Sequence, residues 1–185
     1  MSEVVQINPY TNNEIYRRNY DSVELVQEKI SLLKGAQKIW RDLNLVRRKE
    51  ILNQCLCYFR ENEEQICREI TEQMGKPIQQ SRNEMNGFFE RAEYLLSVAE
   101  ESLKPEIIEN GGIVKRAIGH APLGTVLIIS AWNYPLMIPL NGVLTALLAG
   151  NSVLLKHSIN TLSIGDHFAK AFGDIKDCPG ILQHL

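Results

Sequence analysis

The chain contains 185 residues, enough for one ordinary domain or for a domain and part of a second. Its composition, 44% hydrophobic and 23% charged, is that of a folded globular protein, and a net charge of -2 does not suggest electrostatic attraction to nucleic acid or to an anionic membrane. The N-terminus carries no secretory apolar region, and no apolar run reaches the length of a bilayer span. We therefore expect a cytoplasmic protein with neither nucleic-acid nor membrane partners.

The first hundred residues predict mainly helices. Asp21 begins a sequence that resembles a capping box, and apolar residues then recur at helical spacing. The same spacing predicts a second helix over residues 45–59, a third over 66–74 that ends at Gly75, and a fourth over 88–99. Charged residues between the apolar positions are interpreted as the solvated faces of these helices.

Strand signals replace the helical spacing from residue 107 onward. The turn sequence Asn-Gly-Gly at 110–112 lies between apolar pairs and predicts a hairpin over residues 107–118, because glycine tolerates positive φ. Residues 125–130 and 152–155 are continuous, mainly apolar runs. Such runs are typical of strands that are buried on both faces of a parallel sheet.

A helix over residues 136–149 is predicted between these strands, and another over 163–172 leads to a third strand that begins at 181–182. Strand, helix and strand in this order form a βαβ unit, half of a nucleotide-binding fold. The predicted fold class is therefore α/β, with N-terminal helices and an incomplete Rossmann-like parallel sheet. Such a sheet has open apolar edges, so we expect either a truncated chain or a partner that supplies the rest.

The loop at residues 130–135, Ser-Ala-Trp-Asn-Tyr-Pro, follows the first of these strands, where open α/β folds bind ligands. The Asn133 amide can donate a hydrogen bond to negative charge developing on a carbonyl oxygen. On spacing alone, a turn or helix cap before Pro135 is the favoured interpretation, and Trp132 alone is more often a core residue. Lys156 leaves the second strand, where it can bind an anionic ligand or simply extend to solvent.

The four cysteines, Cys55, Cys57, Cys67 and Cys178, are interpreted as free thiols. Neither a C-x-x-C nor an H-E-x-x-H pattern accompanies them, so no metal site is predicted. The sequence also lacks G-x-G-x-x-G, which argues against a conventional dinucleotide-binding turn.

Several stretches resemble the aldehyde dehydrogenase superfamily. They are P-L-G-T-V-L-I-I-S-A-W-N-Y-P and A-L-L-A-G-N-S-V-L-L-K, with I-N-P-Y-T-N-N-E and E-Q-M-G-K-P upstream and C-P-G-I-L downstream. They occur in the order expected for that family and cover nearly the whole chain. M-G-K-P-I-x-Q together with K-H-x-x-N is most similar to the succinate-semialdehyde dehydrogenase branch.

The resemblance implies an enzyme that oxidises an aldehyde, in this branch succinate semialdehyde, to the carboxylic acid with NAD or NADP. Asn133 would be the catalytic oxyanion-hole amide, and Lys156 would bind the adenosine ribose or a 2′-phosphate. The cofactor-binding residues implied in this way are Ser130, Ala131, Trp132, Asn133, Lys156, His157, Ser158 and Ile159.

Two departures from the family pattern limit these implications. Ile159 stands where many members have an acidic residue that binds the ribose, so strict NAD preference is not implied and NADP is not excluded by charge repulsion. The ring of His157 can equally cap or pack, and it is given no catalytic role. The family's nucleophilic cysteine and general-base glutamate have no counterpart here, so we expect the isolated chain to be inactive.

The resemblance assigns residues 1–106 to the N-terminal helical part of the cofactor-binding domain, 107–124 to an oligomerisation hairpin, and 125–185 to the first βαβ portion of the NAD(P)-binding domain. It implies a homo-oligomer, or a C-terminal portion that is missing. Two other interpretations stay open, a non-catalytic interaction module and the remnant of a truncated gene. The gene sequence directly downstream would distinguish these interpretations. If it encodes a glycine-rich turn, a glutamate motif and a cysteine motif, the chain is an interrupted enzyme and not a module. A relative that reduces acyl phosphates is disfavoured by the W-N-Y-P loop.

Overall fold

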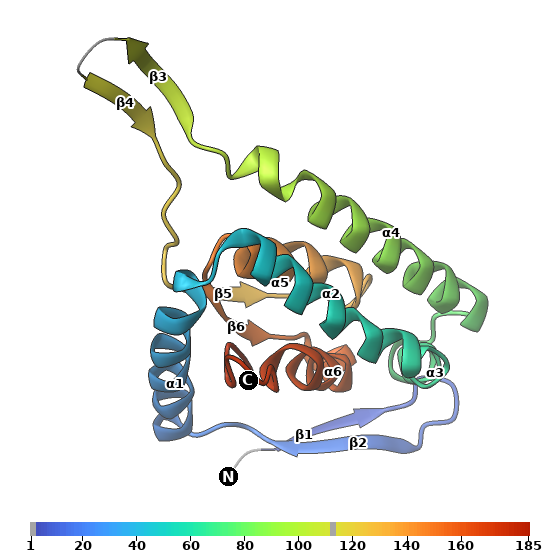
Figure 1. Ribbon diagram of the computed structural model, residues 1–185. Coiled ribbons are helices and arrows are strands. Elements are labelled where there is room, and N and C mark those ends of the chain that lie inside the picture. Colours follow the sequence, from blue (N-terminus) through green and yellow to red (C-terminus); the bar gives the residue numbers. More distant parts are fainter. Residues whose placement is uncertain (1–2, 112–113) are drawn as a thin grey trace.

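The computed structural model describes residues 3–111 and 114–185 (Figure 1). The elements in chain order are β1 (Glu3–Ile7), β2 (Glu14–Asn19), α1 (Val23–Asp42), α2 (Leu45–Glu61), α3 (Glu63–Met74), α4 (Ile78–Ser102), β3 (Glu106–Gly111), β4 (Val114–Ile118), β5 (Thr125–Ile129), α5 (Met137–Leu148), β6 (Ser152–Lys156), the 3-10 helix η1 (Ile159–Thr161), α6 (Leu162–Gly173) and β7 (Leu182–His184). Within this described part, no helix is both long and apolar enough to cross a bilayer.

A three-stranded parallel sheet with the order β5-β6-β7 lies at the centre of the molecule. Helices α1, α5 and α6 pack against it, and α2, α3 and α4 complete the helical surroundings (Figure 1). The predicted α/β fold class and the third strand are therefore confirmed.

The prediction that both apolar strands are buried on both faces is right for β6 and wrong for β5. Residues 152–155 are buried, whereas in β5 the side chains of Leu127 and Ile129 are 55% and 70% exposed. The reason is that β5 is an edge strand with one covered face. On that face α5 approaches so closely that a Cβ at Gly142 would lie 2.9 Å from Cδ1 of Ile128.

The first helix begins one residue later than its sequence suggests. Ser22 is the N-cap, and its hydroxyl accepts a hydrogen bond from the backbone N–H of Leu25 at 3.2 Å. Asp21 instead forms an ion pair with Lys29. The predicted end of the third helix is confirmed, because Gly75 has a left-handed conformation with φ of 75°.

An antiparallel hairpin of β1 and β2 precedes the helices and was not predicted. Its turn is organised by Asn8, whose side-chain oxygen accepts hydrogen bonds from the backbone N–H groups of Tyr10 and Thr11 at 2.9 and 3.1 Å. The hairpin is fixed to the main body by Tyr16, whose hydroxyl donates to Asp166 of α6 at 2.6 Å. The region 1–106 is therefore not purely helical.

The C-terminal end of α5 is held by side chains from the first two helices. Trp40 is fully buried, and its indole N–H donates to the carbonyl of Leu147 at 2.8 Å. The Arg48 guanidinium donates to the carbonyl of Leu148 at 3.1 Å. The last carbonyls of a helix have no partners within the helix, so these donors stabilise the end of α5 and fix its position.

The predicted hairpin over 107–118 is confirmed as β3 and β4, which extend away from the main body (Figure 1). The predicted turn at 110–112 falls partly outside the described residues, because 112 and 113 are not described. Apolar side chains of Ile107, Ile108, Val114 and Ile118 are exposed along the hairpin. Its assignment as an oligomerisation element stays a prediction.

Candidate functional site

The loop that carries Asn133 and the segment that begins at Lys156 leave the same edge of the sheet. Ile129 at the end of β5 is in register with Lys156 at the end of β6, and the backbone N–H of Ser130 donates to the carbonyl of Lys156 at 3.0 Å. Because the strands are parallel, both segments emerge at their carboxyl ends. The structure therefore places the segments that carry Asn133 and Lys156 at one edge of the sheet.

The side chains of the loop are mostly open to solvent. Ser130 is buried, whereas Ala131, Trp132, Asn133 and Tyr134 are exposed. Among the residues described, no group forms a hydrogen bond with the side-chain amide of Asn133, and the N-terminus of α5 is bound by a different side chain. The helix-cap interpretation of Asn133 is therefore wrong, and its amide is accessible to a ligand.

Glu84 of α4 and Lys76, just before that helix, lie beneath the loop. One carboxylate oxygen of Glu84 accepts hydrogen bonds from the backbone N–H groups of Leu136 and Met137 at 2.8 and 3.2 Å. The other accepts from the Lys76 ammonium at 2.5 Å, and the same ammonium donates to the backbone carbonyl of Asn133 at 2.9 Å. Sequence reasoning missed Glu84. The only available signal was Lys76, which belongs to the G-K-P stretch of the resemblance.

His157 provides a second tether for the loop. Its ring is buried, with Nε2 2.9 Å from the carbonyl oxygen of Pro135 and Nδ1 3.3 Å from the hydroxyl of Thr161. Burial lowers the pKa of His157 to about 4, so the ring is neutral near pH 7. A carbonyl only accepts, which places the ring proton on Nε2. The geometry favours the packing interpretation of this ring, and the cofactor contact that the resemblance implies for His157 stays a prediction.

A largely apolar cavity of about 220 Å³ lies beside the cofactor segment. Lys156, Ile159 and Leu185 line it at the carboxyl ends of β6 and β7, and Tyr20 lines it from the segment after β2. Ser158 caps η1, since its hydroxyl accepts from the N–H of Asn160 at 3.3 Å. Because Lys156 lines the cavity, the cavity adjoins the residue that the resemblance predicts to bind the ribose or a 2′-phosphate of the cofactor.

The cysteines differ in their surroundings. Burial raises the pKa of Cys55 to about 12 and of Cys67 to about 11, and it also raises the pKa of Cys178. These three groups are therefore thiols at neutral pH, and a thiol is a much weaker nucleophile than a thiolate. Within the described ranges, no three or more His, Cys, Asp or Glu side chains form a group suited to a metal ion.

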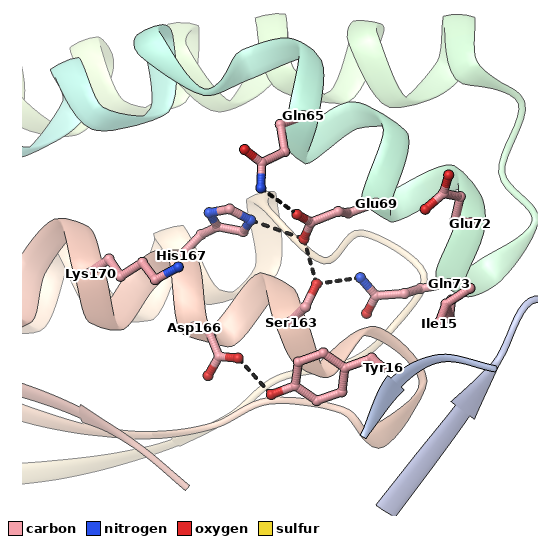
Figure 2. Close-up of a pocket in the computed structure, with 10 residues that line it drawn as sticks. All are labelled: Ile15, Tyr16, Gln65, Glu69, Glu72, Gln73, Ser163, Asp166, His167 and Lys170. Carbon is pink, nitrogen blue, oxygen red and sulfur yellow. Dashed lines mark hydrogen bonds and ion pairs between the residues drawn. The ribbon is translucent and has the colours of Figure 1, made fainter. Parts of the chain in front are cut away.

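A second, polar pocket of about 350 Å³ lies between β2, α3 and α6 (Figure 2). At its wall, the hydroxyl of Ser163 and Nε2 of His167 both bind the same carboxylate oxygen of Glu69, at 2.6 and 3.0 Å. The hydroxyl of Ser163 therefore donates a hydrogen bond to the carboxylate and not to His167. The other ring nitrogen of His167 contacts the hydroxyl of Tyr58 at 2.8 Å. A catalytic triad needs a base that accepts the serine proton, and this network does not provide one.

An open parallel sheet with helices packed against it and loops at its carboxyl edge defines the Rossmann-like α/β class of fold. The profile of the aldehyde dehydrogenase family matches residues 2–185. The chain belongs to the aldehyde dehydrogenase family.

Individual relatives cover the chain almost completely. An NAD(P)+ succinate semialdehyde dehydrogenase of Escherichia coli is 30% identical over 175 residues, which are 94% of this chain and 37% of the relative. An NADP(+) D-glyceraldehyde dehydrogenase of Thermoplasma acidophilum is 25% identical over 183 residues, which are 98% of this chain and 37% of that protein. The chain thus spans little more than a third of the length of these curated relatives.

Solved structures agree on the fold. Lactaldehyde dehydrogenase from Escherichia coli matches with a TM-score of 0.91 at 25% identity, over 100% of this chain and 39% of that one. Succinic semialdehyde dehydrogenase from Streptococcus pyogenes, solved in complex with NADP+, matches with a TM-score of 0.88 at 21% identity, over 98% of this chain and 40% of that one. This arrangement of helices and strands is therefore that of an aldehyde dehydrogenase over the matched part.

Proposed function

We propose that this chain supplies the oxyanion-hole amide and part of the cofactor-binding edge of an NAD(P)-dependent aldehyde dehydrogenase. The observation that carries the proposal is that the exposed Asn133 loop and Lys156 leave adjacent parallel strands at one edge, joined by the hydrogen bond from Ser130 to Lys156. The proposed reaction is oxidation of an aldehyde to its carboxylic acid. Succinate semialdehyde is the proposed substrate, because an E. coli relative that is 30% identical carries that name.

In this proposal Asn133 acts as a hydrogen-bond donor. Its side-chain N–H would bind the aldehyde oxygen as negative charge develops there, and such donors are most effective when they are already in place. The amide is exposed and its backbone carbonyl is fixed by Lys76, so the donor needs little rearrangement to meet a substrate.

The residues around Lys156 fit a nucleotide. The ammonium would bind the adenosine ribose or a 2′-phosphate, and the adjoining apolar cavity of about 220 Å³ offers space to a ligand. Ile159, at the cavity wall, has no charge that would repel a 2′-phosphate, which supports NADP as well as NAD. When bound, the nicotinamide cofactor supplies a hydride acceptor.

We also propose that the isolated chain does not turn over. Aldehyde oxidation through a covalent intermediate needs a cysteine thiolate and a base for hydrolysis. Cys55, Cys67 and Cys178 have raised pKa values, and Cys178 lies buried with its thiol 3.1 Å from the carbonyl of Ala36. An oxyanion donor without a thiolate beside it does not oxidise an aldehyde.

A second candidate function, a non-catalytic interaction module, is supported by exposed apolar surface. Leu127 and Ile129 of β5 and the apolar side chains of the β3–β4 hairpin face solvent. We propose that this surface associates with further copies of the chain or with the remaining part of a complete enzyme. Light scattering after size-exclusion chromatography tests this, and a stable monomer at high concentration would argue against it.

The cofactor proposal is tested by saturation-transfer NMR, which detects weak ligands. We expect adenine and ribose protons of NAD and NADP to receive saturation from the chain, and Lys156→Ala to weaken the effect more than Lys170→Ala, a control at an exposed lysine of α6. Equal effects of the two substitutions would contradict the assignment of Lys156. Production of NADH or NADPH from succinate semialdehyde by the chain alone would contradict the proposed inactivity.

A further inference from the structure

We propose that the ion pair of Lys76 and Glu84 positions the Asn133 amide, so that these two residues are positioning residues for the proposed reaction. The inference rests on the proposed function, in which the Asn133 amide binds the aldehyde oxygen. Its structural content stands on contacts within the chain, because a buried pair formed by Glu84 of α4 and Lys76 just before that helix controls the loop.

Glu84 replaces the N-cap that α5 lacks. No side chain of α5's own N-terminal segment caps the helix, and its first residues would leave N–H groups without acceptors. The carboxylate of Glu84 accepts from Leu136 and Met137, and its negative charge lies at the positive end of the helix dipole. The side chain of Glu84 is only 1% exposed. The start of α5, and with it the end of the loop, is therefore fixed by a residue of another helix.

Lys76 compensates this buried charge and extends its effect to the loop. A carboxylate out of reach of water is costly unless a positive partner is present, and the Lys76 side chain is itself only 8% exposed. The ammonium also donates to the backbone carbonyl of Asn133 and lies 4.5 Å from the centre of the Tyr134 ring. Lys76 thus contacts the residues on both sides of one peptide bond, the backbone carbonyl of Asn133 and the side-chain ring of Tyr134.

The roles of the two residues are chemically distinct. Glu84 has to accept two backbone N–H groups, whereas Lys76 has to donate to a backbone carbonyl. The double substitution Lys76→Glu with Glu84→Lys, the exchanged pair, would keep two opposite charges side by side. It would place a donor against the N–H groups of α5 and an acceptor against the carbonyl of Asn133. A pair that only contributes stability would tolerate this exchange better than a pair that positions the loop.

The test uses the ¹⁵N-labelled chain without ligand. The side-chain amide signal of Asn133 is assigned by its loss in Asn133→Asp, and hydrogen exchange is followed at the backbone N–H of Leu136 and, as an internal reference, of Leu154 in β6. The variants are Glu84→Gln, Lys76→Met and the exchanged pair. Glu90→Gln, at an exposed carboxylate of the same helix, is the matched control.

In Glu84→Gln we expect exchange at Leu136 to accelerate about tenfold or more, because a hydrogen bond to a charged acceptor is stronger than one to a neutral amide. Exchange at Leu154 should change less. The Asn133 side-chain signal should move in Glu84→Gln and in Lys76→Met. Lys76→Arg, which keeps the charge and the donors, should restore the signal toward its original position.

Unchanged Asn133 and Leu136 signals, with a lower unfolding midpoint only, would overturn the proposal, and so would normal signals in the exchanged pair. If Glu84→Gln does not fold, Glu84→Asp provides the same comparison, since the shorter side chain keeps the charge but cannot reach all of its partners. None of these readouts involves a cofactor. A negative saturation-transfer result for NAD and NADP would therefore leave the positioning result standing, and the reverse also holds.

Discussion

Replacing Glu69 by glutamine should lower the stability of the protein at neutral pH and have little effect in strong acid. The Glu69 carboxylate lies in the network of Figure 2, where it accepts hydrogen bonds from His167, Ser163 and Gln65. Burial by itself raises the pKa of Glu69, but these hydrogen bonds outweigh burial and lower the pKa from 4.5 to about 2.

Because the pKa of Glu69 is lower in the folded chain, the unfolded chain binds this proton more tightly. The stabilisation is therefore complete above the unfolded value of 4.5 and is lost as the pH falls toward about 2. One pKa unit corresponds to about 1.4 kcal/mol, so this interval corresponds to about 3 kcal/mol. The Glu69 side chain is 24% exposed, and screening by water reduces the expected effect to about 2 kcal/mol.

Urea unfolding followed by circular dichroism measures this effect at several pH values between neutrality and about pH 3. The free energy of unfolding of wild type should exceed that of Glu69→Gln by about 2 kcal/mol near neutrality, and the difference should shrink below about pH 4. Glu101→Gln, at a side chain that is 84% exposed, is the control and should have no such pH dependence. A difference for Glu69→Gln that stays constant over this range would show that the hydrogen bonds to Glu69 do not lower its pKa.

Two further predictions concern packing and thiol reactivity. Gly165→Ala should destabilise the protein by about 1–3 kcal/mol in the same unfolding assay, because the added Cβ would lie 2.2 Å from Nε2 of the buried His184. Gly35→Ala, in a helix with no neighbour within 4 Å of the added Cβ, should be neutral or stabilising, and equal losses for both would contradict this packing. With iodoacetamide on the folded protein, the exposed Cys57 should be alkylated before the buried Cys178, as peptide mass spectrometry would show. Faster modification of Cys178 would be inconsistent with its position in the core.

The sheet was predictable because its strands have a local signature. Residues 152–155 are continuously apolar or small, and β6 is buried on both faces as that pattern indicates. The β1–β2 hairpin lacked such a signature. Its buried positions include Gln6, whose side-chain N–H donates to the carbonyl of Ile159 at 2.6 Å. The buried face of β1 therefore carries a polar residue, and the alternation of polar and apolar residues that marks a strand in the sequence is absent.

The groups beneath the candidate site could not be predicted from local patterns. Glu84 lies among polar residues of α4 and resembles a residue of a solvated helix face, yet it contacts Leu136, 52 positions away. Glu69 and His167 are separated by 98 positions. Their partnership follows from the packing of helices on the sheet, whereas Asn133 and Lys156 were identified because each follows directly from a strand.

The most direct measurement for the whole account is a titration of the ¹⁵N-labelled chain with NADP, followed by the backbone amide signals. Binding at one edge of the sheet predicts that signals of residues 130–134 and of residues 156–159 shift together, with the same apparent dissociation constant. Shifts confined to the β3–β4 hairpin, or to only one of the two segments, would show that Asn133 and Lys156 do not belong to a common site.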